Sequence, residues 1–231
     1  MTAPDETARA DMSEARRHLV EQVESEVRRF GDGAGNDRLD PAVREALLRV
    51  PREAFVPERM RHLAYANRPL PIGHGQTISQ PLVVALMTHH LGLRPGARVL
   101  DVGTGSGYQT AVLAELADEV VTVEIVEPLA LAAREALEKL GYGNVTFRIG
   151  DGVVVARDLG PFDGVLVAAA ADRVPEALVE QLAPDGRLVV PVGVRPDAQD
   201  LMLITKGQDG SLRRRSLFPV SFVPLTGGRH P

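Results

Sequence analysis

The sequence predicts an α/β fold in which a mostly parallel seven-stranded sheet carries helices on both faces and is preceded by an N-terminal helical extension. Two patterns indicate this fold. From residue 80 onward, short continuous apolar runs alternate with segments whose apolar residues recur at helical spacing, which is typical of a parallel sheet covered on both faces. The last two apolar runs, 200–206 and 212–225, are separated by only a short GQDG turn, so we expect them to pair antiparallel.

The first third of the chain lacks this alternation of apolar strands and helices. Residues 1–12 are polar and acidic, and we expect a disordered tail there. Apolar spacing predicts a helix over 13–29, and Pro41 opens a shorter helix that ends at Pro51. Residues 51–79 are broken by prolines and glycines and have no clear period. Since a connector of this length inside a compact domain is usually functional, we expect it to face the substrate.

The chain of 231 residues fits one α/β domain with an appendage. We expect 13–78 to form an N-terminal helical and substrate-facing segment that packs as one unit with a ligand-binding α/β domain over 79–231. In the latter we expect strands over 97–103, 119–125, 145–151, 162–170 and 186–193, and helices over 80–91, 106–116, 128–140 and 175–182.

Composition excludes several classes of protein. A formal net charge of −5 argues against a protein whose main partner is nucleic acid. The absence of cysteine removes disulfides, thiolate metal sites and cysteine nucleophiles. The six histidines are not spaced with carboxylates as metal ligands would be, so we expect no metal. The charged start and the lack of a long apolar stretch argue against a signal peptide and a membrane span, and we expect a cytoplasmic protein.

A glycine-rich loop, DVGTGSG over 101–107, follows the first predicted strand of the sheet. Helical N–H groups are free at such a strand-to-helix turn, and the backbone can approach a ligand closely. A dinucleotide site would need its third glycine where Tyr108 stands. Glu124 ends the next strand and is placed to accept hydrogen bonds from both hydroxyls of a ribose, and Asp151 follows the third strand near the place for a base. The expected ligand contacts are Asp101, Gly103, Thr104, Gly105, Ser106, Gly107, Glu124, Asp151 and Gly152.

This arrangement resembles the class I S-adenosylmethionine-dependent methyltransferases, whose first motif is a D/E-x-G-x-G-x-G loop followed by an acidic residue at the end of the second strand. The resemblance implies a Rossmann-like methyltransferase fold and S-adenosylmethionine as cofactor. The lack of cysteine excludes methylation at cytosine C5, and AAAADRVP after the fourth strand is unlike the motif of enzymes that methylate base amines.

The strings VPREAFVP, AYANRPLPIGHGQTISQP, GTGSGYQ and GRLVVPVG, spread over residues 40–227, closely resemble the protein-L-isoaspartate O-methyltransferases. Members of that family methylate the free α-carboxylate of L-isoaspartyl residues in damaged proteins and peptides. The ester then collapses to a succinimide, which reopens partly to aspartate. The resemblance implies isoaspartyl proteins and peptides as partners, with no role for nucleic acid or membrane, and we expect a monomer.

Ser79 in QTISQP matches the family's catalytic serine, and Thr77, Ile78 and Gln80 lie beside it as expected substrate contacts. A carboxylate is already ionised at neutral pH, so its methylation needs no strong base, and a hydroxyl that hydrogen-bonds one carboxylate oxygen can hold the geometry. The alternative is that Ser79 merely caps the following helix, although Pro81 would then leave only Leu82 as a donor.

The sequence departs from the family pattern in three places: Asn67 replaces an acid in A-Y-x-D, Val153-Val154-Val155 replaces a glycine-and-aromatic continuation, and Ala168 stands where threonine is frequent. The departures at Asn67 and Val154 leave open a peptide-tailoring carboxyl methyltransferase that acts on aspartate of a dedicated precursor peptide. A third hypothesis is a non-enzymatic binding protein, against which the intact loop argues. The apolar residues near the C-terminus, Val220, Phe222 and Val223, are interpreted as core packing without a functional role.

Overall fold

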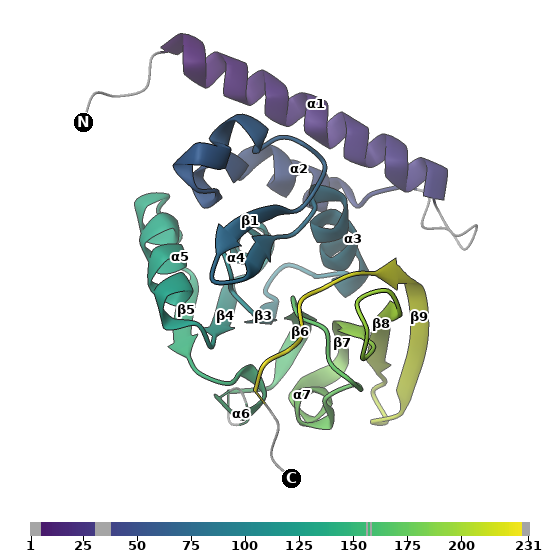
Figure 1. Ribbon diagram of the computed structural model, residues 1–231. Coiled ribbons are helices and arrows are strands. Elements are labelled where there is room, and N and C mark those ends of the chain that lie inside the picture. Colours follow the sequence, from purple (N-terminus) through teal and green to yellow (C-terminus); the bar gives the residue numbers. More distant parts are fainter. Residues whose placement is uncertain (1–5, 31–37, 156, 158, 228–231) are drawn as a thin grey trace.

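The computed structural model describes residues 6–30, 38–155, 157 and 159–227. Within this part of the chain a seven-stranded sheet has the order β5-β4-β3-β6-β7-β8-β9 (Figure 1). Its members are β3 (Arg98–Val102), β4 (Glu119–Glu124), β5 (Val145–Ile149), β6 (Phe162–Val167), β7 (Leu182–Val192), β8 (Gln199–Lys206) and β9 (Leu212–Val220). The first five in spatial order are parallel, whereas β8 is antiparallel to both its neighbours. The predicted fold class and the closing antiparallel pair are confirmed.

The helices that cover the sheet are α3 (Pro81–Leu91), α4 (Tyr108–Ala114), α5 (Glu127–Lys139), α6 (Gly152–Val155) and α7 (Glu176–Glu180). Alternate residues of the central strands point to opposite faces, as the pleat requires. Val99 of β3 packs in one cluster with α3 and α4, whereas its neighbour Leu100 packs in a second cluster with α7. The strands therefore bury both faces, which explains their continuous apolar runs.

The order of the strands reverses beside β3. The chain passes from β3 through β4 to the edge strand β5 and then returns to place β6 on the other side of β3. In open parallel sheets the ligand crevice lies outside the carboxyl ends of the strands at such a switch point. The fold thus predicts a site after Val102 and Val167, the last residues of β3 and β6.

The N-terminal part lies across the α3 and α4 face of the molecule (Figure 1). It comprises α1 (Glu6–Phe30), α2 (Pro41–Arg49) and two 3₁₀ helices, η1 (Arg52–Phe55) and η2 (Glu58–Leu63). Helix α1 begins at Glu6, so the expectation of a tail through residue 12 is wrong for 6–12, whose Ala, Arg, Glu and Met residues favour helix. Residues 1–5 lie outside the described residues.

The segment without a clear period is ordered. Besides η1 and η2 it contains a hairpin, β1 (Leu70–Gly73) and β2 (Gln76–Ile78), in which Leu70 pairs with Ile78. Its turn places His74 between two glycines, all three with positive φ. Arg52, which belongs to this segment, is fully buried. Its Nε donates to the Ala64 carbonyl at 2.9 Å, and its guanidinium lies 4.8 Å from the Tyr108 ring centroid. Burial lowers the pKa of Arg52 to about 10.

The C-terminal segment leaves the sheet earlier than expected. The last predicted strand reached residue 225, but β9 ends at Val220, and residues 221–227 run back across the strand ends. There the Ala170 N–H donates to the Val223 carbonyl at 2.8 Å and the Leu225 N–H to the Ala170 carbonyl at 2.8 Å. Among the described residues no helix combines the length and apolarity that a bilayer crossing requires.

Candidate active site

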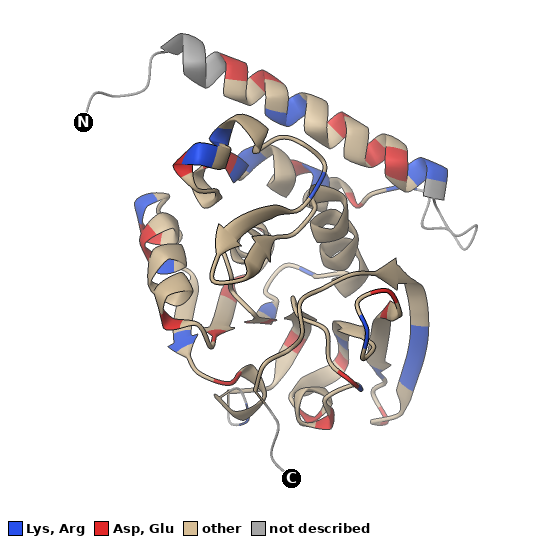
Figure 2. Ribbon diagram, in the orientation of Figure 1, with Lys and Arg blue, Asp and Glu red and all other residues tan. Residues whose placement is uncertain are grey.

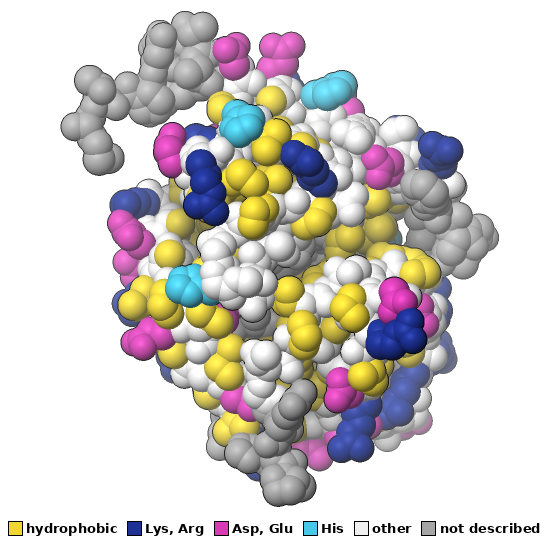
Figure 3. Space-filling view, in the orientation of Figure 1, with side chains coloured by type: hydrophobic (Ala, Val, Ile, Leu, Met, Phe, Trp, Pro, Cys, Tyr) yellow, Lys and Arg dark blue, Asp and Glu magenta, His cyan; other side chains and the backbone are white. Residues whose placement is uncertain are grey.

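A cavity of about 470 Å³ opens at the carboxyl ends of β3, β4 and β6. The parts of the chain that line it include the glycine loop, the end of β4, the hairpin end that leads into α3, and the C-terminal segment, together with residues after β5, β6 and β7. In Figure 3 this face of the molecule is hollowed near its middle, with hydrophobic side chains on either side. A volume of this size suits a small-molecule ligand. The cavity therefore lies at the switch point that the strand order predicts.

The glycine loop forms one wall of the cavity. Gly103, Gly105 and Gly107 all have positive φ, which explains why glycine stands at each position. Gly103, Thr104, Gly105 and Ser106 line the cavity. Gly107 does not: it precedes α4, and a Cβ there would lie 3.2 Å from atoms of Ala133 and Leu137. Its role is close packing of α4 against α5.

Glu124 is held against this loop. The carboxylate is 6% exposed and accepts hydrogen bonds from the Gly105 N–H at 2.8 Å and from the Val126 N–H at 2.9 Å, one on each oxygen. A carboxylate has about four acceptor positions, so each oxygen keeps one for a ligand. Because Glu124 lines the cavity, the two hydroxyls of a ribose can use these positions.

Asp101 lies beneath the loop, fully buried, and does not line the cavity. Its Oδ2 accepts hydrogen bonds from the Thr110 hydroxyl at 2.6 Å and the Thr122 hydroxyl at 3.1 Å, while Oδ1 has no hydrogen-bond partner among the described residues. Burial raises the pKa of Asp101 to about 7. The hydrogen bonds from the two hydroxyls lower this pKa, and the negative charge of Glu124 raises it slightly. Asp101 therefore does not reach the cavity, and its predicted contact with the cofactor stays a prediction.

The third strand end contributes Gly152 to the cavity. A Cβ at Gly152 would lie 2.4 Å from Val102 Cγ1, so no larger residue fits without displacing the wall. Asp151 does not line the cavity but starts α6, where its Oδ1 accepts from the Val153 N–H at 2.9 Å. The predicted contact of Asp151 with a base stays a prediction.

The hairpin end supplies the opposite wall, with Thr77, Ile78, Ser79 and Gln80 all lining the cavity. Ser79 is half-buried, and its hydroxyl makes no hydrogen bond with any other described residue. It does not cap α3, because Gln80 is the N-cap residue and makes no side-chain capping bond. The capping interpretation of Ser79 is therefore wrong, and its hydroxyl is available to a ligand.

The C-terminal segment completes the cavity, a role that the sequence did not predict. Residues 219–226 line it, although Val220, Phe222 and Val223 were expected only to pack in the core. Gln199 holds this segment: its Nε2 donates to the Phe222 carbonyl at 3.1 Å and its Oε1 accepts from the Phe222 N–H at 2.7 Å. Gln199 is 4% exposed, and its amide is satisfied by these two bonds, which no pattern in the sequence indicates.

The cavity has few charges. None of the described residues that line it is Lys, Arg or His, and its acidic residues are Glu124 and Asp197. Figure 2 shows hairpin β1–β2 and the C-terminal segment without charged residues, whereas Lys and Arg colour part of β9 away from them. Among the described residues no group of three or more His, Asp and Glu side chains could hold a metal ion. An anionic group that enters the site must therefore be oriented by neutral donors.

A family model described as protein-L-isoaspartate(D-aspartate) O-methyltransferase (PCMT) matches residues 34–230. The chain belongs to this family. The resemblance stated from the sequence is thereby confirmed. Helix α1 precedes the matched residues, whereas the hairpin, the glycine loop and the C-terminal segment up to residue 227 all lie within them.

Relatives of the PCMT family match nearly the whole chain. The protein-L-isoaspartate O-methyltransferase 2 of Syntrophobacter fumaroxidans is 50% identical over 214 residues, which are 93% of this chain and 87% of the relative. A Polaromonas protein of the same name is 51% identical over 211 residues, 91% of this chain and 100% of the relative. A Plasmodium falciparum PCMT structure in complex with S-adenosyl-L-homocysteine has a TM-score of 0.77 and 30% identity, covering 91% of this chain and 98% of that one.

Proposed function

We propose that this protein transfers a methyl group from S-adenosylmethionine to the free α-carboxylate of L-isoaspartyl residues in damaged proteins and peptides, which starts their repair through a succinimide. One observation carries the proposal: in a chain of the PCMT family, the available hydroxyl of Ser79 lines the same cavity as the glycine loop and Glu124.

The residues of the cavity fit the cofactor. When bound, S-adenosylmethionine supplies a reactive methyl group on a positively charged sulfur and leaves as S-adenosylhomocysteine. Glu124 has acceptor positions left for ribose hydroxyls, and the absence of a side chain at Gly152 leaves room beside Val102. We assign direct cofactor contacts to Gly103, Thr104, Gly105, Ser106, Glu124 and Gly152. We assign Asp101, Gly107 and Asp151 the role of holding the loop, α4 and α6 in place behind these contacts.

Ser79 is assigned the catalytic hydroxyl. A carboxylate with a pKa of about 4 is ionised at neutral pH, so the nucleophile needs no deprotonation by the protein. The rate then depends on alignment of one carboxylate oxygen with the methyl group, and a hydroxyl that donates to the other oxygen supplies it. Because no described lining residue is cationic, a neutral donor must do this. We assign the task to the Ser79 hydroxyl, which makes no hydrogen bond with another described residue, and we assign Thr77, Ile78 and Gln80 to the surrounding peptide.

The peptide-tailoring alternative is not favoured, because the relatives that match nearly the whole chain are named for isoaspartate. The departure at Asn67 was one reason to consider this alternative. Asn67 does not line the cavity, however, and its side chain accepts a hydrogen bond from the Leu82 N–H. We further propose that the protein acts in the cytoplasm as a monomer, without nucleic acid, membrane or metal.

A pair of peptides tests this function. Purified protein is incubated with labelled S-adenosylmethionine and a peptide that contains one isoaspartyl residue, beside its aspartyl twin. We expect base-labile label on the isoaspartyl peptide and essentially none on the twin. Equal labelling of both peptides, or labelling of the twin alone, would overturn the proposal.

A further inference from the structure

We propose that Asn67 is a positioning residue for Ser79 and that Glu26 of α1 orients Asn67, so that the N-terminal helix controls the geometry of the hairpin end. This inference rests on the proposed function, because it concerns the alignment of the same hydroxyl. It assigns a task to α1, which precedes the residues that the family model matches.

Asn67 joins three parts of the chain. Its Oδ1 accepts from the Leu82 N–H at 3.1 Å, and its carbonyl accepts from Gln80 Nε2 at 3.1 Å. Its Nδ2 donates to Glu26 Oε1 at 3.0 Å. The side chain thus contacts the start of α3 on one side and α1 on the other.

The contact with Leu82 compensates for a weak helix start. Gln80 makes no side-chain capping bond and Pro81 has no N–H, so the Leu82 N–H is the first backbone donor inside α3. Asn67 therefore does from a distant loop what an N-cap residue does locally. Its amide satisfies one of the groups that every helix start leaves without an intrahelical partner.

Ser79 lies between two fixed points. On one side Ile78 pairs with Leu70 in the hairpin, and on the other Gln80 and Leu82 are tied to Asn67. The Ser79 hydroxyl has no hydrogen bond with another described residue, so no polar partner orients it and its place depends on the backbone on either side. Loss of the Asn67 contacts removes the side-chain hydrogen bonds that hold the backbone on the α3 side of Ser79, where only the packing of Pro81 and Val84 remains.

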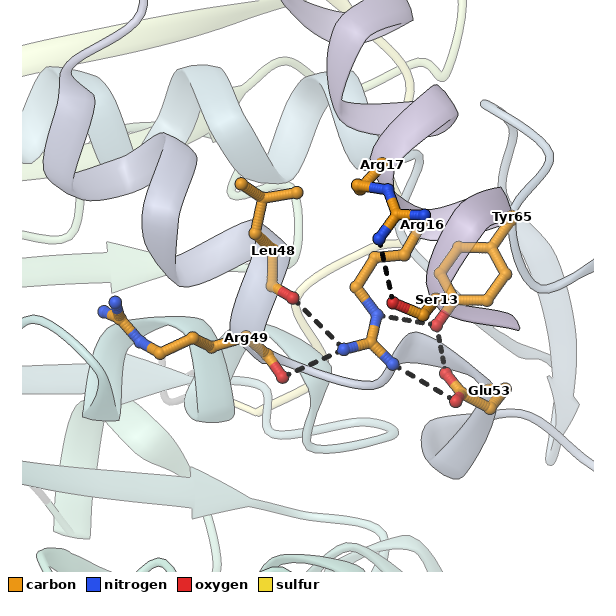
Figure 4. A network of polar contacts seen from close by, with 7 residues as sticks. All are labelled: Ser13, Arg16, Arg17, Leu48, Arg49, Glu53 and Tyr65. Carbon is orange, nitrogen blue, oxygen red and sulfur yellow. Dashed lines mark hydrogen bonds and ion pairs between the residues drawn. The ribbon is translucent and has the colours of Figure 1, made fainter. Parts of the chain in front are cut away.

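Helix α1 also contacts the segment before the hairpin through Arg16. Arg16 donates to the Tyr65 hydroxyl at 2.9 Å, to Glu53 at 3.3 Å and to the Leu48 carbonyl at 3.1 Å, and the Tyr65 hydroxyl in turn donates to Glu53 (Figure 4). Tyr65 stands two residues before Asn67. Burial raises the pKa of Tyr65, so it stays a neutral donor. Residues 65–67 are therefore held against α1 by both Arg16 and Glu26.

Exchanging the two groups of the Asn67–Glu26 contact tests the inference. In Asn67→Asp the new carboxylate still accepts from Leu82 but faces the Glu26 carboxylate across the present contact of 3.0 Å. The like charges repel and displace the hairpin end. In the double variant Asn67→Asp with Glu26→Gln, the introduced glutamine amide donates to the introduced carboxylate. Glu21→Gln, on an exposed part of α1, removes a similar charge as a matched control.

The readouts are kcat and KM for the isoaspartyl peptide, the Kd of S-adenosylhomocysteine by calorimetry, and hydrogen exchange of the Leu82 amide. We expect Asn67→Asp to lower kcat about tenfold and to speed Leu82 exchange, with the Kd changed less than about twofold. The double variant should return kcat to within about twofold of wild type, and Glu21→Gln should match wild type.

Unchanged kcat and Leu82 exchange in Asn67→Asp would overturn the inference, as would a double variant that does not recover. If Asn67→Asp does not fold, the double variant provides the test. The inference requires that the double variant folds and has a kcat within about twofold of wild type. If wild type labels no isoaspartyl peptide, the proposed function fails, and Leu82 exchange in Asn67→Asp and in the double variant still decides whether the contact holds α3.

Discussion

Replacement of Asp101 by asparagine should remove the pH-dependent loss of stability that ionisation of this buried carboxyl causes. The carboxyl is fully buried, and its pKa rises from 3.8 to about 7. The difference between these values corresponds to about 4 kcal/mol. Because the folded state holds the proton more tightly than the unfolded chain, the wild type loses stability as pH rises from about 4 to 7, and no further above 7. Asparagine keeps an oxygen for the hydroxyls of Thr110 and Thr122 and has no proton to lose.

Urea unfolding of both proteins at several pH values between 4.5 and 8 measures this cost. Contributions of the other carboxylates are common to both proteins, so the difference in unfolding free energy isolates Asp101. We expect that difference, wild type minus Asp101→Asn, to fall steadily with rising pH and to level off near pH 7. A difference that is constant, or that grows with pH, would show that burial does not dominate the pKa of Asp101.

Three further substitutions test the walls of the cavity. Gly152→Ala places a Cβ against Val102. We expect the free energy of unfolding to fall by about 1–3 kcal/mol in thermal unfolding, and S-adenosylhomocysteine to bind at least about tenfold more weakly by calorimetry. Unchanged values of both would contradict the steric argument. Glu124→Gln leaves one oxygen for two backbone donors, so affinity for S-adenosylhomocysteine should fall about tenfold or more, and equal affinity would exclude a role in the site. Gln199→Ala removes both bonds to Phe222 and should raise the peptide KM about fivefold at a stability cost of about 1–3 kcal/mol, which an unchanged KM would contradict.

Much of the sheet and its ligand-binding edge could be predicted, because buried parallel strands leave a strong pattern. The runs that became β3, β4 and β6 are continuously apolar, and glycines at positive φ mark the loop after β3. Glu124 and Ser79 were also predicted, and both line the cavity. In each case a short local pattern in the sequence indicates the residue, although distant contacts also hold Ser79 in place.

Other features depend on contacts that no local pattern reveals. Strands β1 and β2 have four and three residues, too few for a clear alternation, and their prolines and glycines suggested an irregular connector. Residues 221–225 are largely apolar, and apolar sequence does not distinguish a core from the wall of a cavity. Asn67 looked like a departure from a pattern, yet its side chain bonds residues that are 15 and 41 positions away. Such long-range partners are set by the folded arrangement alone.

We propose that the Ser79 hydroxyl at the hairpin end aligns the substrate carboxylate. The most direct measurement compares Ser79→Ala with wild type in single-turnover methylation of the isoaspartyl peptide, with the Kd of S-adenosylhomocysteine measured on the same preparation. We predict a fall in the rate of about 100-fold while the Kd changes less than about twofold. A rate close to that of wild type in a variant that binds S-adenosylhomocysteine normally would contradict the claim.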